Sequence, residues 1–109
     1  MPKSSKGSRR ERELLEFLSK QGFVVHRVAG SGLGEDAICD LVAVKAGEVH
    51  FVECKSRIKT YYTKQNQEQL EQLINISNSC MAKPVLAVKL NYKDWRIFDL
   101  NDGIPKKVQ

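Results

Sequence analysis

The chain has 109 residues, of which 41% are hydrophobic, and a formal net charge of +5. This length suits one domain with its own core and no need of disulfides. The longest apolar run, Leu41 to Val44, is far shorter than the roughly 20 residues that span a bilayer, and we expect no secretory signal. The three cysteines are an odd number without metal-finger spacing, so we expect a reduced, intracellular protein.

The first predicted element is a helix behind a basic arm. Residues 1–7 are expected to form a flexible arm. Ser8 and Glu11 have the spacing of a capping box, and apolar residues follow at helical intervals up to Gly22. We therefore predict a helix over residues 8–21.

The rest of the chain alternates strands, loops and one further helix. Strands are predicted over 23–29, 38–45, 48–56, 85–90 and 95–100, a glycine-rich loop over 30–34, a turn at 46–47, a loop over 57–63, a helix over 64–79 and an irregular tail over 101–109. This order predicts a single α/β domain, residues 1–109, with a mixed β-sheet of about five strands flanked by helices.

Basic residues gather in two stretches, residues 3–12 and 55–64. Phosphate backbones attract such patches through charge and counterion release, so we expect a nucleic-acid partner. The alternative is a solvated surface that only aids solubility. The candidate DNA-binding residues in these stretches are Arg9, Arg10, Arg12, Arg57, Lys59 and Lys64.

Two charged residues share one face of the predicted strand 48–56. Side chains alternate along a strand, so Glu53 and Lys55 point the same way as Val49 and Phe51. Charges beside a core face are costly unless they are paired or bind a metal. This strand is therefore the first candidate for a functional site.

The preceding strand supplies a second carboxylate. If residues 46–47 form a two-residue hairpin loop, Lys45 lies opposite Glu48, and Asp40 lies opposite Glu53. Opposed Cβ atoms are roughly 5 Å apart, a distance at which two carboxylates favour a hard divalent cation such as Mg²⁺. A three-residue loop would turn Asp40 to the other face unless a bulge corrected the register.

The chemistry that fits this set is phosphodiester hydrolysis. A metal activates water and neutralises charge on the phosphate, and a nearby lysine orients the water or stabilises the developing charge. The alternative is a cross-strand salt bridge of Lys55 with Asp40 or Glu53, on a solvated edge.

Asp40 followed by Glu53-Cys54-Lys55, on consecutive strands after a first helix, resembles the PD-(D/E)xK nuclease superfamily. Further segments, spread over roughly residues 6 to 98, look like the archaeal Holliday junction resolvases. These segments are Lys6-Gly7-Ser8, Glu11-Arg12-Glu13-Leu14, Gly22-Phe23, Arg27, Ala29-Gly30-Ser31, Asp40-Leu41-Val42-Ala43, Pro84-Val85-Leu86-Ala87-Val88-Lys89 and Trp95-Arg96. The resemblance implies a restriction-endonuclease-like fold.

The resemblance also implies roles for individual residues. Asp40 and Glu53 would bind the metal with the carbonyl of Cys54, and Lys55 would be the catalytic lysine. Glu11 would complete the metal site, although it has an alternative role as the capping-box partner of the first helix. Further implied residues are Ser31 beside the scissile phosphate, Arg12 and Arg27 on the basic surface, and Gln67 at the start of the second helix.

The family acts as a homodimer with Mg²⁺ or Mn²⁺ and nicks two opposed strands of a four-way junction. The resemblance therefore implies an intracellular, cytoplasmic enzyme that meets chromosomal or viral DNA. Cys39 stands where the family has proline, and Glu35 and Asp36 add acids to the glycine loop, which puts substrate preference in doubt. A nuclease for other DNA structures and a non-catalytic junction-binding module stay open as alternatives.

Overall fold

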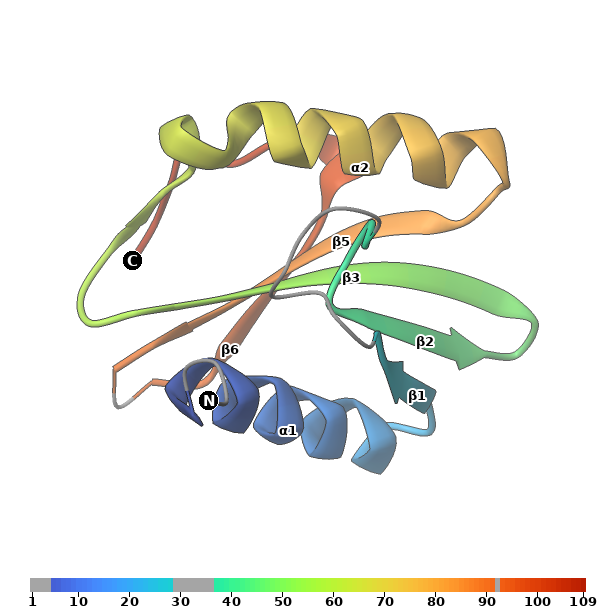
Figure 1. The fold of residues 1–109 in the computed structure, drawn as a ribbon, viewed down its shortest axis with the longest axis horizontal. Coiled ribbons are helices and arrows are strands. Elements are labelled where there is room, and N and C mark those ends of the chain that lie inside the picture. The colour runs from blue at the N-terminus through green and yellow to red at the C-terminus, as the bar shows by residue number, and fades with distance from the viewer. Residues whose placement is uncertain (1–4, 29–36, 92) are drawn as a thin grey trace.

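The computed structural model describes residues 5–28, 37–91 and 93–109. Its elements are α1 (Ser5–Lys20), β1 (Val24–Arg27), β2 (Leu41–Lys45), β3 (Glu48–Arg57), β4 (Tyr61–Tyr62), a 3₁₀ turn (Thr63–Asn66), α2 (Gln67–Ser79), β5 (Lys83–Leu90), β6 (Trp95–Asp99), a second 3₁₀ turn (Leu100–Asp102) and β7 (Lys107–Val108). A mixed five-stranded sheet in the order β1-β2-β3-β5-β6 lies between α1 and α2 (Figure 1). The predicted fold class is confirmed.

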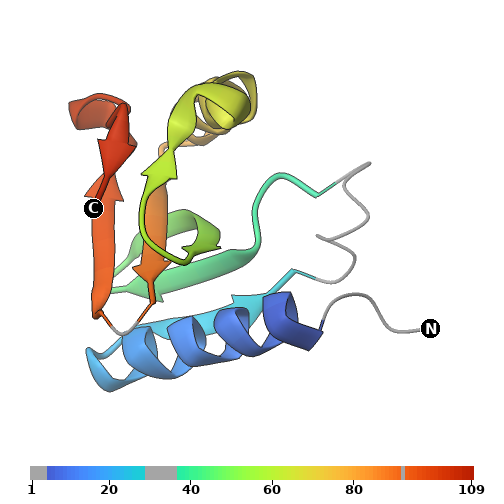
Figure 2. The same ribbon diagram turned by 90° about the vertical axis from the view of Figure 1, so that its left-hand side faces the viewer.

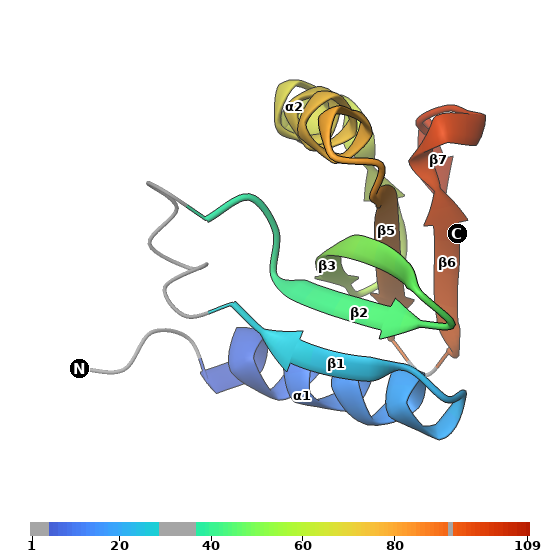
Figure 3. The ribbon, with the colours of Figure 1, turned by 90° about the vertical axis from the view of Figure 1, so that its right-hand side faces the viewer.

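The sheet combines both kinds of strand pairing. β1, β2 and β3 run antiparallel, β3 and β5 are parallel, and β6 returns antiparallel to β5. A parallel pair needs a crossover connection, and α2 is the helix of that crossover. Seen from its ends, the sheet is strongly twisted, with β5 and β6 rising steeply from β1 and β2 (Figures 2 and 3).

The hairpin between β2 and β3 has the predicted two-residue loop. Ala46 and Gly47 have φ of 51° and 77°, and positive φ at both central residues is what the favoured hairpin turn requires. Lys45 pairs with Glu48, as predicted. The ladder continues to Leu41 opposite Val52, which brings Asp40 to the level of Glu53.

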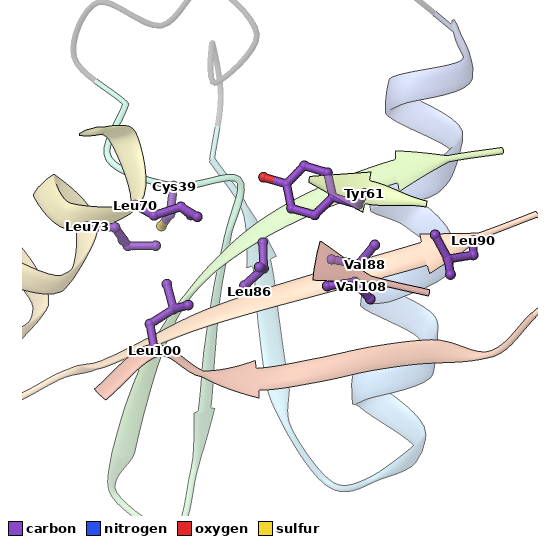
Figure 4. Packing of buried hydrophobic residues seen from close by; sticks show 9 residues of the cluster. All are labelled: Cys39, Tyr61, Leu70, Leu73, Leu86, Val88, Leu90, Leu100 and Val108. Carbon is purple, nitrogen blue, oxygen red and sulfur yellow. The ribbon is translucent and has the colours of Figure 1, made fainter. Parts of the chain in front are cut away.

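Each face of the sheet has its own core. On the α1 face, Leu14 and Leu18 pack with Leu41, Ala43 and Val52. The core on the α2 face contains Leu70 and Leu73 of α2, Leu86 and Val88 of β5, Tyr61 of β4, and Cys39, Leu90, Leu100 and Val108 (Figure 4). Within the described part of the chain, no helix has the length and apolar character needed to cross a membrane.

The start of the chain differs from the prediction. α1 begins at Ser5, so Ser8 lies inside the helix, and the predicted cap at Ser8 is wrong. The last part of the predicted arm, residues 5–7, is helical, and residues 1–4 lie outside the described residues. The capping-box pattern was the local signal, but the residues before it continue the same helix.

The end of the chain also differs. Lys107–Val108 pairs antiparallel with Tyr61–Tyr62, so the predicted irregular tail and the predicted loop 57–63 each contribute a short strand. Tyr61 is 0% exposed and Val108 is 3% exposed, so this small sheet covers the α2 core. The pairing joins residues far apart in the sequence, and hydrophobic periodicity does not predict such pairs.

Candidate active site

Asp40 stands directly before β2 and is held by three hydrogen bonds. Its backbone N–H donates to Val52 O at 3.0 Å, and its carbonyl accepts from Val28 N–H at 2.9 Å. Its side-chain Oδ2 accepts from the backbone N–H of Cys54 at 2.8 Å. The carboxylate is therefore anchored between β1 and β3 with a fixed direction.

Glu53 lies in the middle of β3, on the face covered by α2, and is only 5% exposed. Burial and, after it, the nearby negative charge of Asp40 raise the pKa of Glu53 to about 7. Lys55, two residues along the same face, opposes this shift in pKa through an ion pair of 3.2 Å from its Nζ to Glu53 Oε2. The predicted grouping of Asp40, Glu53 and Lys55 is thus present in the structure.

A residue that the sequence analysis did not single out completes this group. Gln69 of α2 donates from Nε2 to Glu53 Oε2 at 3.3 Å, and its Oε1 accepts from Lys55 Nζ at 3.3 Å. Gln67 is exposed, and its side chain contacts Glu71 at 3.4 Å. At 100° per residue, the two glutamines flank the apolar face of α2 on opposite sides, so helical periodicity alone does not tell them apart.

Glu11 approaches from the other side of the sheet. Its Oε1 accepts two hydrogen bonds from Arg27, at 3.2 Å from Nε and 3.0 Å from Nη2. Its charge contributes to raising the pKa of the Cys54 thiol, behind burial and Asp40. Over residues 5–28, 37–91 and 93–109, no three Asp, Glu, His or Cys side chains group closely enough to hold a metal ion. The metal-binding role of Glu11 stays a prediction.

The other candidate residues differ in their exposure and in their partners within the protein. Arg9, Arg12, Lys59 and Lys64 are exposed. Arg10 is paired with Glu13 at 2.8 Å, and Arg57 stacks over the ring of Tyr61 with 5.2 Å from its Cζ to the ring centroid. Ser31 lies outside the described residues.

Cys39 and Cys54 pack in the hydrophobic cores on the two faces of the sheet. Cys39 is buried and donates from Sγ to Leu41 O at 3.2 Å, and burial raises the pKa of its thiol to about 12. The side chain of Cys54 packs against the α1-side core, so only its backbone is available to the group around Asp40. Both thiols are protonated at neutral pH, which is unsuitable for binding a metal through sulfur.

The donor set fits a hard divalent cation. Mg²⁺ takes oxygen ligands, keeps several waters, and is usually held by one or two carboxylates together with substrate phosphates. Asp40 and Glu53 are two carboxylates close enough for one to raise the pKa of the other. A bound dication would reverse this effect and hold both groups ionised.

Comparisons with known proteins identify the family of the chain. The model of the family described as "Archaeal holliday junction resolvase (hjc)" matches residues 2–107. The chain is 46% identical to the crossover junction endodeoxyribonuclease Hjc of Methanocaldococcus jannaschii, over 82% of this chain and 62% of the relative. It is 38% identical to the enzyme of the same name from Archaeoglobus fulgidus, over 86% of this chain and 68% of that relative.

A viral relative and a solved structure extend the comparison. The crossover junction endodeoxyribonuclease of Sulfolobus islandicus rod-shaped virus 1 is 33% identical, over 89% of this chain and 83% of the viral protein. The crystal structure of Archaeoglobus fulgidus Hjc, a Holliday junction resolvase, superposes with a TM-score of 0.70 and 35% identity, over 85% of this chain and 75% of that chain. The chain belongs to the archaeal Holliday junction resolvase family.

Proposed function

We propose that this protein is a structure-selective endodeoxyribonuclease that resolves four-way DNA junctions during recombination and repair. It would cut two opposed strands by phosphodiester hydrolysis that depends on Mg²⁺, with Mn²⁺ as a substitute. The observation that carries the proposal is the group formed by Asp40, buried Glu53 and Lys55 in a chain of this family.

The site residues would have different roles in the reaction, according to their chemistry. Asp40 and Glu53 would hold the divalent cation, with the Cys54 carbonyl and Glu11 as further oxygen donors. When bound there, the cation would supply an activated water and positive charge beside the scissile phosphate. Lys55, oriented by its ion pair with Glu53, would stabilise negative charge that develops on the phosphate oxygens.

The basic residues would position the DNA. Exposed arginines and lysines bind phosphates through charge and shape without reading sequence. Arg10, Arg27 and Arg57 have partners within the protein and would contact DNA from these fixed positions. The proposed DNA-contacting residues are Arg9, Arg10, Arg12, Arg27, Arg57, Lys59, Lys64, Gln67 and, beside the scissile phosphate, Ser31.

A four-way junction has two equivalent strands to cut, so we propose a homodimer. A twofold-symmetric dimer presents two identical sites to two symmetric targets. Sedimentation equilibrium of the purified protein tests this assembly. The place of action would be inside the cell, where chromosomal or viral DNA is present.

The deciding experiment is cleavage of a labelled four-way junction, in Mg²⁺ or in a chelator, beside a linear duplex and a flapped duplex of the same sequence. Metal-dependent paired nicks in the junction alone would support the proposal. Equal cutting of all substrates would indicate a general nuclease. Junction binding without cutting in any divalent cation would indicate a binding module, an alternative that the intact Asp40, Glu53 and Lys55 already disfavour.

A further inference from the structure

Gln69 is the one α2 side chain described as touching both Glu53 and Lys55, which lie on the adjacent strand β3. The amide, the ammonium and the carboxylate form a closed triangle with sides of 3.2, 3.3 and 3.3 Å. Both Gln69 Nε2 and Lys55 Nζ approach the same oxygen, Glu53 Oε2. We propose that Gln69 is a positioning residue that fixes the catalytic carboxylate and lysine relative to each other.

An amide satisfies both partners at this position. The ammonium of Lys55 is a donor without acceptor capacity, and an ionised Glu53 is an acceptor without donors. An amide side chain offers one acceptor and two donors, so Gln69 accepts from Lys55 with Oε1 and donates to Glu53 with Nε2. A glutamate in its place would repel Glu53, and a lysine would repel Lys55.

The triangle leaves one oxygen of Glu53 out of these contacts. Lys55 and Gln69 both contact Oε2, so Oε1 would be the oxygen left for a cation held with Asp40. Hydrogen bonds around a ligating carboxylate orient it, and their loss typically costs 10–100-fold in metal affinity or activity.

The position of Gln69 depends on how the start of α2 is anchored. Tyr61 donates from its hydroxyl to Asn66 Oδ1 at 3.2 Å, just before the helix begins. The backbone N–H of Thr63 donates to Lys106 O at 3.2 Å, which ties the same turn to the C-terminal segment. Gln69 therefore projects from a fixed helix start onto β3.

The test compares Gln69→Met with Gln72→Met, a change at an exposed glutamine of the same helix that has no assigned role in cutting or DNA binding. Methionine keeps the length and helical preference of glutamine and removes its hydrogen bonds. The inference rests on the proposed function for its cleavage readout, so Mn²⁺ binding by calorimetry provides a second readout that needs no activity. Thermal unfolding of both variants controls for the integrity of α2.

We expect Gln69→Met to lower the single-turnover cleavage rate in saturating Mg²⁺ by about 10- to 100-fold, and to weaken Mn²⁺ binding in the same direction. Junction affinity in a chelator should match the wild type, and Gln72→Met should match it in cleavage and in Mn²⁺ binding.

If Gln69→Met cuts the junction and binds Mn²⁺ like the wild type, the inference about Gln69 is overturned and the proposed function is not. An equal loss in Gln72→Met would overturn the inference in the same way. The wild-type protein could fail to cut the junction while Gln69→Met still weakens Mn²⁺ binding. That outcome would overturn only the proposed function.

Discussion

Glu53 is the only buried charged residue among residues 9–28, 37–91 and 93–109. Burying a carboxylate is costly unless it is paired, and here an adjacent Asp40 adds like-charge repulsion. Lys55 and Gln69 offset part of this cost at one carboxylate oxygen. A bound cation would reduce the free-energy cost of keeping these two carboxylates close together.

The raised pKa of Glu53 predicts a gain in stability when its charge is removed. Its pKa of about 7 lies above the ordinary value of 4.5, so the folded protein binds the proton more tightly than the unfolded chain. Stability without metal should therefore fall as pH rises from about 4.5 to 7, and the loss is complete above that window.

In a chelator at pH 8, Glu53→Gln should raise the free energy of unfolding by roughly 1–3 kcal/mol, with little effect at pH 4. Urea unfolding at both pH values measures this. Glu68→Gln, at an exposed position of α2, is the matched control. An equal gain at both pH values would contradict the predicted linkage.

Removing either carboxylate should separate cutting from binding. Asp40→Asn keeps an oxygen that can accept from Cys54 N–H, and Glu53→Gln keeps the shape of the side chain. Each should lower the junction cleavage rate by at least about 100-fold, the usual loss for one group that stabilises developing charge. Gel-shift affinity for the junction in a chelator should stay unchanged.

The matched control for these variants is Asp102→Asn, an exposed carboxylate in the second 3₁₀ turn. It removes the same charge without touching the group around Glu53. Undiminished cutting by both Asp40→Asn and Glu53→Gln would show that these residues are not the active site.

The β2–β3 hairpin is the element that presents both carboxylates. Its turn places Ala46, a residue with a Cβ, at φ 51°. Asparagine tolerates this left-handed region better than alanine, and Asn-Gly is the preferred sequence of such turns. Ala46→Asn should raise the free energy of unfolding by about 0.5–1 kcal/mol.

A substitution of Gly47, the next residue of the turn, should lower the stability and provides the comparison for Ala46→Asn. Gly47 has φ 77°, and a Cβ there would meet no atom within 4 Å, so Gly47→Ala should cost about 1 kcal/mol through backbone strain alone. Chemical denaturation of both variants measures the two effects. A loss of stability in Ala46→Asn would show that the turn is held by something other than backbone preference.

Local patterns were sufficient for most elements. Alternation along residues 48–56 and the two-residue turn at 46–47 predicted the hairpin and its register. They did not predict β4 or β7, because a two-residue strand carries too little alternation to stand out and its stability comes from its distant partner. The 3₁₀ turn Thr63–Asn66 likewise precedes α2 where periodicity predicted continuous helix.

At the scale of the whole molecule, the site lies where elements from both layers meet. β3 lies between α1 and α2 (Figure 3). Its α2-side face carries Glu53 and Lys55, which both contact Gln69. α2 contributes Gln69 from one layer, and α1 contributes Glu11, paired with Arg27 of β1, from the other. If Glu11 joins Asp40 and Glu53 in holding a cation, as proposed, both helices must be docked before the cation binds.

A divalent cation should stabilise the whole fold. A ligand that binds only the folded state raises the free energy of unfolding by RT ln(1 + [L]/Kd), or about 2.7 kcal/mol at 100 times Kd. Adding Mg²⁺ should therefore raise the midpoint of thermal unfolding of the wild type, and a chelator should reverse the change.

Asp40→Asn is the control for this effect and should show a much smaller rise. If the wild type and this variant respond equally, Mg²⁺ acts elsewhere on the protein. If neither responds, Asp40, Glu53 and Lys55 form only an ion-pair network.

The sequence by itself determined the α/β class and, for a two-residue loop at residues 46–47, the grouping of Asp40, Glu53 and Lys55. These features depend on residues close together in the chain, whose positions follow from strand alternation and turn length. Only the tertiary structure decided that Gln69 rather than Gln67 reaches the buried carboxylate, and that Glu11 pairs with Arg27. Such contacts depend on the angle and height at which a helix packs on the sheet, which side-chain packing over the whole domain determines.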